Sequence, residues 1–105
     1  MITALEEKKA EDILLLDIRG IADFADFFII CSGTSDRMLG ALADAAIECA
    51  RVDHGIKTRV RGLPSSGWLI ADLGDIVIHF FSPDQREYYD LEELWKDGKV
   101  LVRLK

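Results

Sequence analysis

The sequence predicts an α/β domain in which helices pack on a mixed β-sheet of about five strands. Three observations lead to this class. Residues 67–81 place a Gly-Asp step between two runs of apolar residues, a pattern typical of a β-hairpin. Residues 12–18 and 27–31 are short, continuous apolar runs, as in strands covered on both faces. Residues 35–53 repeat apolar side chains at helical spacing, which predicts a long helix able to cover one face of the sheet.

The hairpin is the stretch around which we expect the other elements to be arranged. A turn centred on Leu73 and Gly74 would pair Trp68 with His79, so that the two share a face. One face is then wholly apolar and predicts core: Leu69, Ala71, Leu73, Ile76, Ile78 and Phe80. The other carries Trp68, Ile70, Val77, His79 and Phe81, with Asp72 and Asp75 at the turn. This second face is too apolar for ordinary surface and too polar for ordinary core, so we expect it to stay uncovered and to bind a partner.

The first half of the chain supplies two helices and the two apolar strands. Residues 3–11 are strong helix formers with oppositely charged pairs at i,i+3, which predict a short helix. The helix over 35–53 can be capped by Thr34 or Ser35, and Gly55 fits its C-terminal end.

The remaining segments flank the hairpin. Residues 56–61 alternate, with Lys57, Arg59 and Arg61 on one side, as expected for an edge strand. Ser82, followed by Pro83 and Gln85, predicts the start of a short helix. Residues 90–96 predict one more helical turn, and 99–105 form a possible extra strand.

Length and charge restrict the classes of function. A chain of 105 residues supports one domain, so we expect residues 1–105 to form a single unit. Its net charge of −6 argues against a protein that holds nucleic acid mainly by neutralising phosphates, and favours a basic protein surface as partner. No apolar run approaches a membrane span, and the charged N-terminus does not resemble a signal peptide. Cys31 and Cys49 show no metal or disulfide pattern, so we expect buried thiols in a reducing, cytosolic compartment.

Three sets of residues are candidates for chemistry. The turn Ser32–Ser35 stands between a strand and a helix, where backbone N–H groups can bind an anion, but capping explains it as well and no P-loop lysine follows. Asp72 and Asp75 lack a third ligand, so they favour turn residues over a metal site. His79 has no paired nucleophile, which favours packing or hydrogen bonding beside Trp68, with an interface role nearly as well supported.

Aromatic residues near the end of the chain lie among acids. Tyr88, Leu91, Leu94 and Trp95 form a helical stripe that would dock on the sheet. Aromatic side chains are also typical of the residues that dominate binding at protein interfaces. Periodicity alone does not show which of these aromatic residues pack in the core and which bind a partner.

Five stretches, in order along the chain, carry motifs that together are specific. They are Ala4–Ile13, Asp17–Gly20, Asp26–Arg37, Trp68–Phe80 and Arg86–Trp95. This set resembles the ribosomal silencing factor family, also called RsfS or Iojap. The resemblance implies a fold related to nucleotidyltransferases without their activity. It also implies binding to the large ribosomal subunit through ribosomal protein L-fourteen, which blocks association with the small subunit and represses translation. Members of the family commonly form homodimers when free.

Residues and resemblance together give one expected site and two alternatives. We expect Trp68, His79, Phe81 and Tyr88 to centre the contact with a basic ribosomal protein, with Asp72, Asp84 and Glu92 around its rim, and no catalytic residue, cofactor or metal. The first alternative is a nucleotide-binding protein or nucleotidyltransferase-like enzyme that uses Ser32, Gly33 and Ser35 with Asp75. The second is the same fold with another macromolecular partner.

Overall fold

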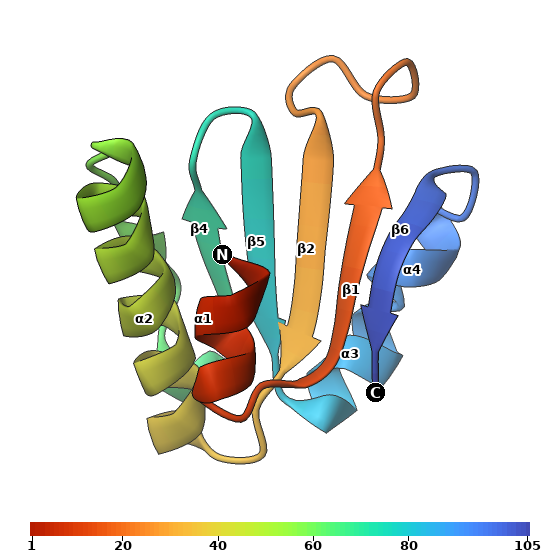
Figure 1. The fold of residues 1–105 in the computed structure, drawn as a ribbon. Coiled ribbons are helices and arrows are strands. Elements are labelled where there is room, and N and C mark those ends of the chain that lie inside the picture. Colours follow the sequence, from red (N-terminus) through yellow and green to blue (C-terminus); the bar gives the residue numbers. More distant parts are fainter.

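A computed structural model describes residues 1–105. Its sheet has six strands in the order β3-β4-β5-β2-β1-β6 (Figure 1). The strands are β1 (Glu11–Asp17), β2 (Phe27–Ser32), β3 (Val60–Arg61), β4 (Trp68–Asp72), β5 (Ile76–Phe81) and β6 (Lys99–Leu104). The helices are α1 (Ile2–Glu7), α2 (Asp36–His54), the 3-10 turn η1 (Pro64–Ser66), α3 (Pro83–Tyr89) and α4 (Leu91–Leu94). Only β2 and β5 pair in parallel, so the predicted mixed sheet is confirmed.

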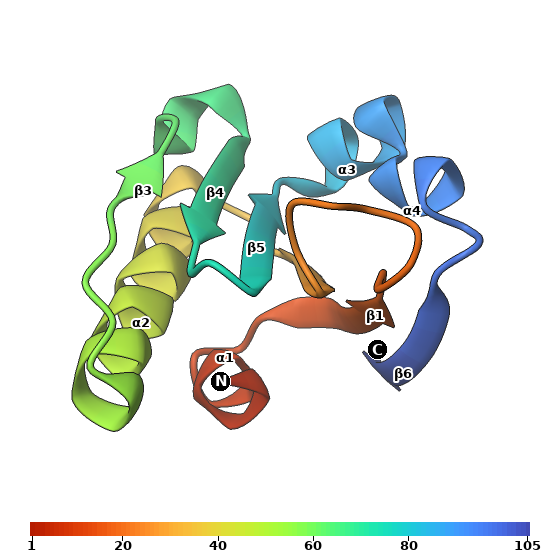
Figure 2. The same cartoon turned by 90° about the horizontal axis from the view of Figure 1, so that it is seen from above.

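Helices cover both faces of the sheet, with α1 and α2 on one side and α3 and α4 on the other (Figure 2). The larger core lies under α1 and α2, and includes Leu5, Leu42, Leu69, Ile78 and Phe80. The second core lies on the opposite face and includes Leu14, Phe28, Val77 and Phe81. Each of these seven strand residues has a chain neighbour that faces the other core, as a two-sided sheet requires.

Local signals set the ends of the two best-predicted helices. The Ser35 Oγ accepts a hydrogen bond from the Met38 N–H at 3.1 Å, and Gly55 closes α2 with a φ of 65°. The Ser82 Oγ accepts from the Gln85 N–H at 3.3 Å, with Pro83 in the first turn of α3. These predicted caps are confirmed. Ser35 and Ser82 each accept a hydrogen bond from a backbone N–H that has no partner within the helix, and Gly55 adopts the left-handed backbone that commonly ends a helix.

The hairpin differs from its prediction in register. Trp68 pairs with Phe81 and Ile70 with His79, because the loop consists of Gly74 and Asp75 and the Leu73 N–H donates to the Ile76 carbonyl at 2.8 Å. The predicted pairing of Trp68 with His79 is therefore wrong by two residues. A shift of two leaves every side chain on its predicted face, because side chains alternate with a period of two.

Two elements at the ends of the sheet also differ from expectation. Residues 99–104 form a full strand, β6, which pairs with β1 and brings the strand count to six. At the other edge only Val60 and Arg61 pair with β4, although the predicted strand covers 56–61.

The C-terminal segment forms two short helices, as predicted from Ser82 and from residues 90–96, but the two do not share one continuous stripe. Asp90 interrupts it with a φ of 46°, so the helical phase restarts at Leu91. Leu91 and Trp95 consequently pack on the second core, whereas Tyr88 and Leu94 are 78% and 72% exposed. The predicted docking stripe is thus right for two of its residues and wrong for Tyr88 and Leu94.

Candidate functional site

The second face of the hairpin is covered by aromatic side chains from the C-terminal helices. The Trp68 ring stacks on Phe81 with centroids 5.0 Å apart and meets the Tyr89 ring at 4.5 Å. The Phe28 ring meets His79 at 4.8 Å and Trp95 at 5.3 Å. Together these rings form a continuous layer between β5 and β2 on one side and α3 and α4 on the other.

His79 lies inside this layer. Its Nδ1 accepts a hydrogen bond from the Trp68 indole N–H at 3.2 Å, so the interpretation as a hydrogen-bonding residue beside Trp68 is confirmed. Burial lowers the pKa of His79 to about 4, because the protein interior disfavours the charged imidazolium. The side chain is therefore neutral at pH 7, and its Nε2 has no hydrogen-bond partner.

The expectation that this face stays uncovered is wrong. His79 is 6% exposed and Phe81 0%, so neither side chain can contact a partner in this conformation. The physical reason is the apolar character of the face itself, which is stabilised when Tyr89, Leu91 and Trp95 exclude water from it. Trp68 remains half-buried.

What the C-terminal helices leave exposed is a mixture of acids and large apolar side chains. Tyr88, Leu94 and Tyr89 are exposed by 78%, 72% and 48%, and Tyr88 contacts Tyr89 with centroids 5.0 Å apart. The acidic arm, as we name this surface, comprises the exposed residues Asp84, Glu87, Tyr88, Tyr89, Asp90, Glu93 and Leu94. Its members belong to α3, α4 and the residue between them, so the segment that seals the core also presents this outer surface.

The structure brings together only some of the predicted rim residues. Asp84 lies on α3 with Tyr88 and belongs to the acidic arm. Asp72 is exposed, but it stands four residues along β4 from Trp68, about 13 Å away at 3.3 Å per residue. Its Oδ1 accepts from the Gly74 N–H at 2.9 Å, the local turn contact expected of an aspartate there.

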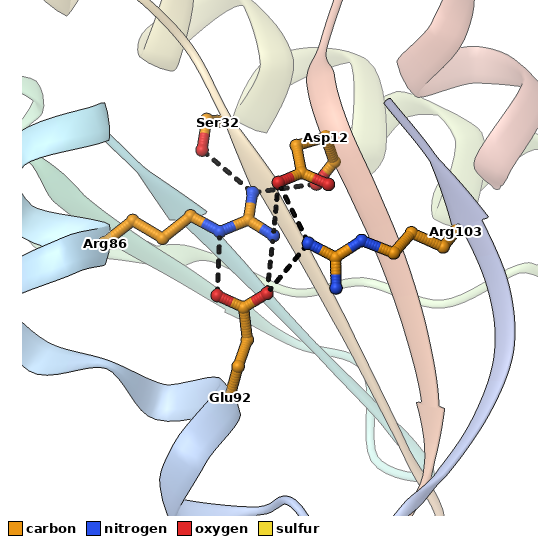
Figure 3. Close-up of polar contacts among 5 residues, drawn as sticks. All are labelled: Asp12, Ser32, Arg86, Glu92 and Arg103. Carbon is orange, nitrogen blue, oxygen red and sulfur yellow. Dashed lines mark hydrogen bonds and ion pairs between the residues drawn. The ribbon is translucent and has the colours of Figure 1, made fainter.

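Glu92 belongs to an ion network centred on Arg86 (Figure 3). Arg86 is 8% exposed, and its Nη1 donates to the Asp12 carbonyl at 2.7 Å and to the Ser32 Oγ at 2.9 Å. Its Nε and Nη2 donate to the two carboxylate oxygens of Glu92 at 3.2 and 3.1 Å. Arg103 from β6 joins the network through Asp12 at 3.2 Å.

Sequence reasoning missed this network. Arg86 stands 74 residues from Asp12 and 54 from Ser32, and no spacing signal links such distant positions. Asp12 and Arg86 do lie inside the motifs that carry the family resemblance, which was the available indication. The network joins the ends of β1, β2 and β6 to α3 and α4, and so fixes the acidic arm on the sheet.

The turn proposed for nucleotide binding is engaged by the protein itself. The Ser32 hydroxyl is 5% exposed and bonded to Arg86, while the Gly33 N–H donates to the Phe81 carbonyl at 3.0 Å. Asp75 precedes β5 at the end where Ile76 pairs with Phe27, whereas Ser32 pairs with Phe81 at the other end. The two are therefore about 20 Å apart at the rise of a strand, so the structure does not bring Ser32 and Asp75 together.

Three further findings concern thiols, metal ions and membranes. Both cysteines are free and buried, as predicted, and burial raises the pKa of the Cys31 thiol to about 12. No group of three or more His, Cys, Asp or Glu side chains is arranged to hold a metal ion. None of the helices combines the length and apolarity that crossing a membrane requires.

The fold and the site define a small α/β domain that presents an acidic, aromatic surface on helices fixed to a six-stranded sheet. Residues 1–104 match the family model described as "Ribosomal silencing factor during starvation". The chain therefore belongs to the ribosomal silencing factor family, and the resemblance predicted from its motifs is confirmed.

Individual relatives agree with this assignment. The chain is 44% identical to ribosomal silencing factor RsfS of Bacillus subtilis over 98 residues, which span 92% of this chain and 82% of the relative. It is 33% identical to "Mitochondrial assembly of ribosomal large subunit protein 1" of Mus musculus, covering 90% of this chain and 43% of that protein. A crystal structure of a Chromobacterium violaceum protein superposes with a TM-score of 0.85 at 32% identity, covering 99% of this chain and 86% of that one.

Proposed function

We propose that this protein binds the large ribosomal subunit through ribosomal protein L-fourteen and represses translation by blocking association with the small subunit. The names of its relatives, a ribosomal silencing factor and a factor for assembly of the mitochondrial large subunit, support a ribosomal role. The contact with L-fourteen follows from the family resemblance. The proposed site of action is the cytoplasm.

The observation that carries the proposal is the exposure of Tyr88 and Leu94 among carboxylates. A tyrosine 78% exposed and a leucine 72% exposed lie on helices whose other exposed residues include Asp84, Glu87 and Glu93. Such a surface suits a basic protein, because opposite charges accelerate encounter and apolar burial slows release. We place the contact on the acidic arm, with the half-buried Trp68 beside Tyr89 and with Glu92 at the border.

Blocking needs affinity and bulk and requires no catalytic step from this protein. A domain that measures 33 × 33 × 23 Å is large enough to keep the facing surfaces of the two ribosomal subunits apart. That Asp72 contacts the ribosomal protein at the rim of the interface remains a prediction, and it requires an interface that extends beyond the acidic arm. A homodimer in the free state, which the resemblance implies, is part of the proposal, and sedimentation equilibrium over a range of protein concentrations tests it.

Sedimentation with purified large subunits tests the binding step. Tyr88→Ala should weaken binding by about 2 kcal/mol, or roughly thirtyfold, if the ring is a central contact. The matched control is Val52→Ala, which truncates another large apolar side chain, 62% exposed but on α2 over the opposite face of the sheet. Equal affinities for the wild type and both folded variants would remove the acidic arm from the interface.

A further inference from the structure

The basic residues of the sheet edge at β3 form a second charged surface, separate from the acidic arm. Residues 54–71 contain Lys57, Arg59 and Arg61 and no aspartate or glutamate. This segment therefore carries three positive charges, which leaves nine net negative charges for the rest of the chain, since the whole chain carries −6. The strand order and Figure 2 place β3 at the opposite edge of the sheet from β6 and α4.

The backbone directs these three cations outward. The Thr58 hydroxyl donates to the Asp72 carbonyl at 2.8 Å, and Val60 pairs with Ala71. Thr58 and Val60 are half-buried in consequence, while Lys57, Arg59 and Arg61 are all exposed. The alternation of exposed and half-buried residues over 57–61 places the three cations in a row on the same side of this segment.

None of the three cations is neutralised within the chain. The ion pairs of the protein involve Arg19, Arg51, Arg86, Lys96 and Arg103, and none of them involves a member of this row. Arg59 and Arg61 line a hollow of about 460 Å³ with Thr58, Val60 and Asp72. Asp72 is the only carboxylate there, and one of its oxygens is engaged by the Gly74 N–H.

Protection of a sheet edge does not account for the whole row. A cation on an edge strand discourages pairing with another chain, and Arg61 stands in the paired stretch where that role applies. Lys57 and Arg59 precede the stretch that pairs with β4. A row of exposed, unpaired cations is complementary to a polymer with repeated negative charge, which among macromolecules is the phosphate backbone of a nucleic acid.

We propose that Lys57, Arg59 and Arg61 contact the phosphate backbone of ribosomal RNA while the acidic arm holds a basic protein. This inference rests on the proposed binding to the large subunit and adds a second class of contact at the other edge of the sheet. The RNA contact is auxiliary, since an overall acidic chain gains its main affinity elsewhere. It orients the domain on the subunit, because two separated contacts fix a rotation that one contact leaves free.

The test measures binding to purified large subunits as a function of salt. The variant Lys57→Gln/Arg59→Gln/Arg61→Gln is compared with Lys8→Gln/Lys9→Gln/Lys105→Gln, which removes the same charge from exposed lysines elsewhere. We expect the first variant to bind at least tenfold more weakly, with the slope of log affinity against log salt reduced by about 2 to 3, and the control to follow the wild type.

Each outcome bears on one of the two proposals. If the wild type does not bind subunits, the proposed function fails and the RNA contact fails with it. If the wild type binds and the two triple variants match each other in affinity and salt slope, the RNA contact is wrong while the proposed function stands.

Ultraviolet crosslinking of the wild-type complex identifies the partner of the row. Peptides that carry nucleotides should map to residues 56–63. Their absence from that segment, or crosslinks from it to a ribosomal protein only, would overturn the assignment to RNA.

Discussion

At the scale of single residues, the Trp68–His79 pair shows how a binding surface and a core can look alike in sequence. Both residues are polar enough to suggest a surface, and both are typical of interfaces. In the structure the indole N–H and the imidazole Nδ1 satisfy each other at 3.2 Å, which lowers the cost of burying them. The pattern of the strand predicted which face they share, but it could not show that α3 and α4 return to cover that face.

The buried imidazole makes stability depend on pH. The pKa of His79 is lowered to about 4 in the folded protein from 6.5, so the unfolded chain binds more protons between these values. The stabilisation is complete above pH 6.5 and is lost as the pH falls toward 4, by up to about 3 kcal/mol at 1.36 kcal/mol per unit. Urea unfolding of the wild type and His79→Phe should be measured at several pH values in this range. The free energy of unfolding should fall less steeply with falling pH in the variant than in the wild type.

His54 supplies the control, since it is exposed on the last turn of α2. The free energy of unfolding of His54→Gln should depend on pH as it does in the wild type. Identical pH profiles for all three proteins would mean that the imidazole of His79 titrates normally and is not buried as described.

At the scale of elements, Arg86 connects the acidic arm to the sheet. It bonds to Asp12, Ser32 and Glu92, which belong to β1, β2 and α4. Because the guanidinium is 8% exposed, its removal leaves buried oxygen atoms without their donor. The arm is short, with helices of 7 and 4 residues, so its stability depends on such contacts more than on helix propensity.

Arg86→Ala should lower the free energy of unfolding by about 3 to 5 kcal/mol, the usual cost of breaking a buried ion pair on one side. Arg51→Ala is the matched control, because the Arg51–Glu48 pair is largely exposed to solvent and its loss should change the stability far less. Denaturant titration compares the two. Similar losses for both variants would contradict a structural role specific to the Arg86 network.

The junction between β4 and α3 depends on a close approach at Gly67. Its φ is 78°, and a Cβ there would lie 2.7 Å from the Ser82 Oγ and 2.6 Å from the Gln85 Cγ. Gly74 has a φ of 91° but open space around it. Gly74→Ala should therefore cost about 1 to 2 kcal/mol from backbone strain alone, and Gly67→Ala clearly more. Equal changes in melting temperature would show that the contact with the α3 cap is unimportant.

The elements also show how far sequence reasoning reached. Caps at Ser35, Gly55 and Ser82 were predictable because they act through contacts within a few residues. The separate helical turn that begins after Asp90 was predictable, but the left-handed backbone of Asp90 was not, because that conformation is unusual for a residue other than glycine. It changes the helical phase at Leu91, so the stripe that joined Tyr88 to Leu91 and Trp95 was wrong for Tyr88. The hairpin register was missed by two residues because Leu73–Gly74 and Gly74–Asp75 are both acceptable turns.

At the scale of the whole molecule, charge is divided between the helices on one face of the sheet and the sheet edge at β3. The acidic arm lies behind the side of β1 and β6, and the basic row lies at β3 (Figure 2). Composition predicted an acidic protein suited to a basic partner, and the family assignment is shown by the match over residues 1–104. The division itself was not predictable, because it depends on the strand order that puts β3 at an edge and on the packing of α3 and α4 over one face of the sheet.

The most direct test of the proposed function is the joining of ribosomal subunits. Large subunits are incubated with the wild-type protein, Tyr88→Ala or Val52→Ala before small subunits are added, and joined ribosomes are measured by sucrose-gradient sedimentation. Wild type and Val52→Ala should reduce joining in proportion to their occupancy of the large subunit, and Tyr88→Ala should require roughly thirtyfold more protein for the same effect. Full joining on large subunits saturated with wild-type protein would contradict the account.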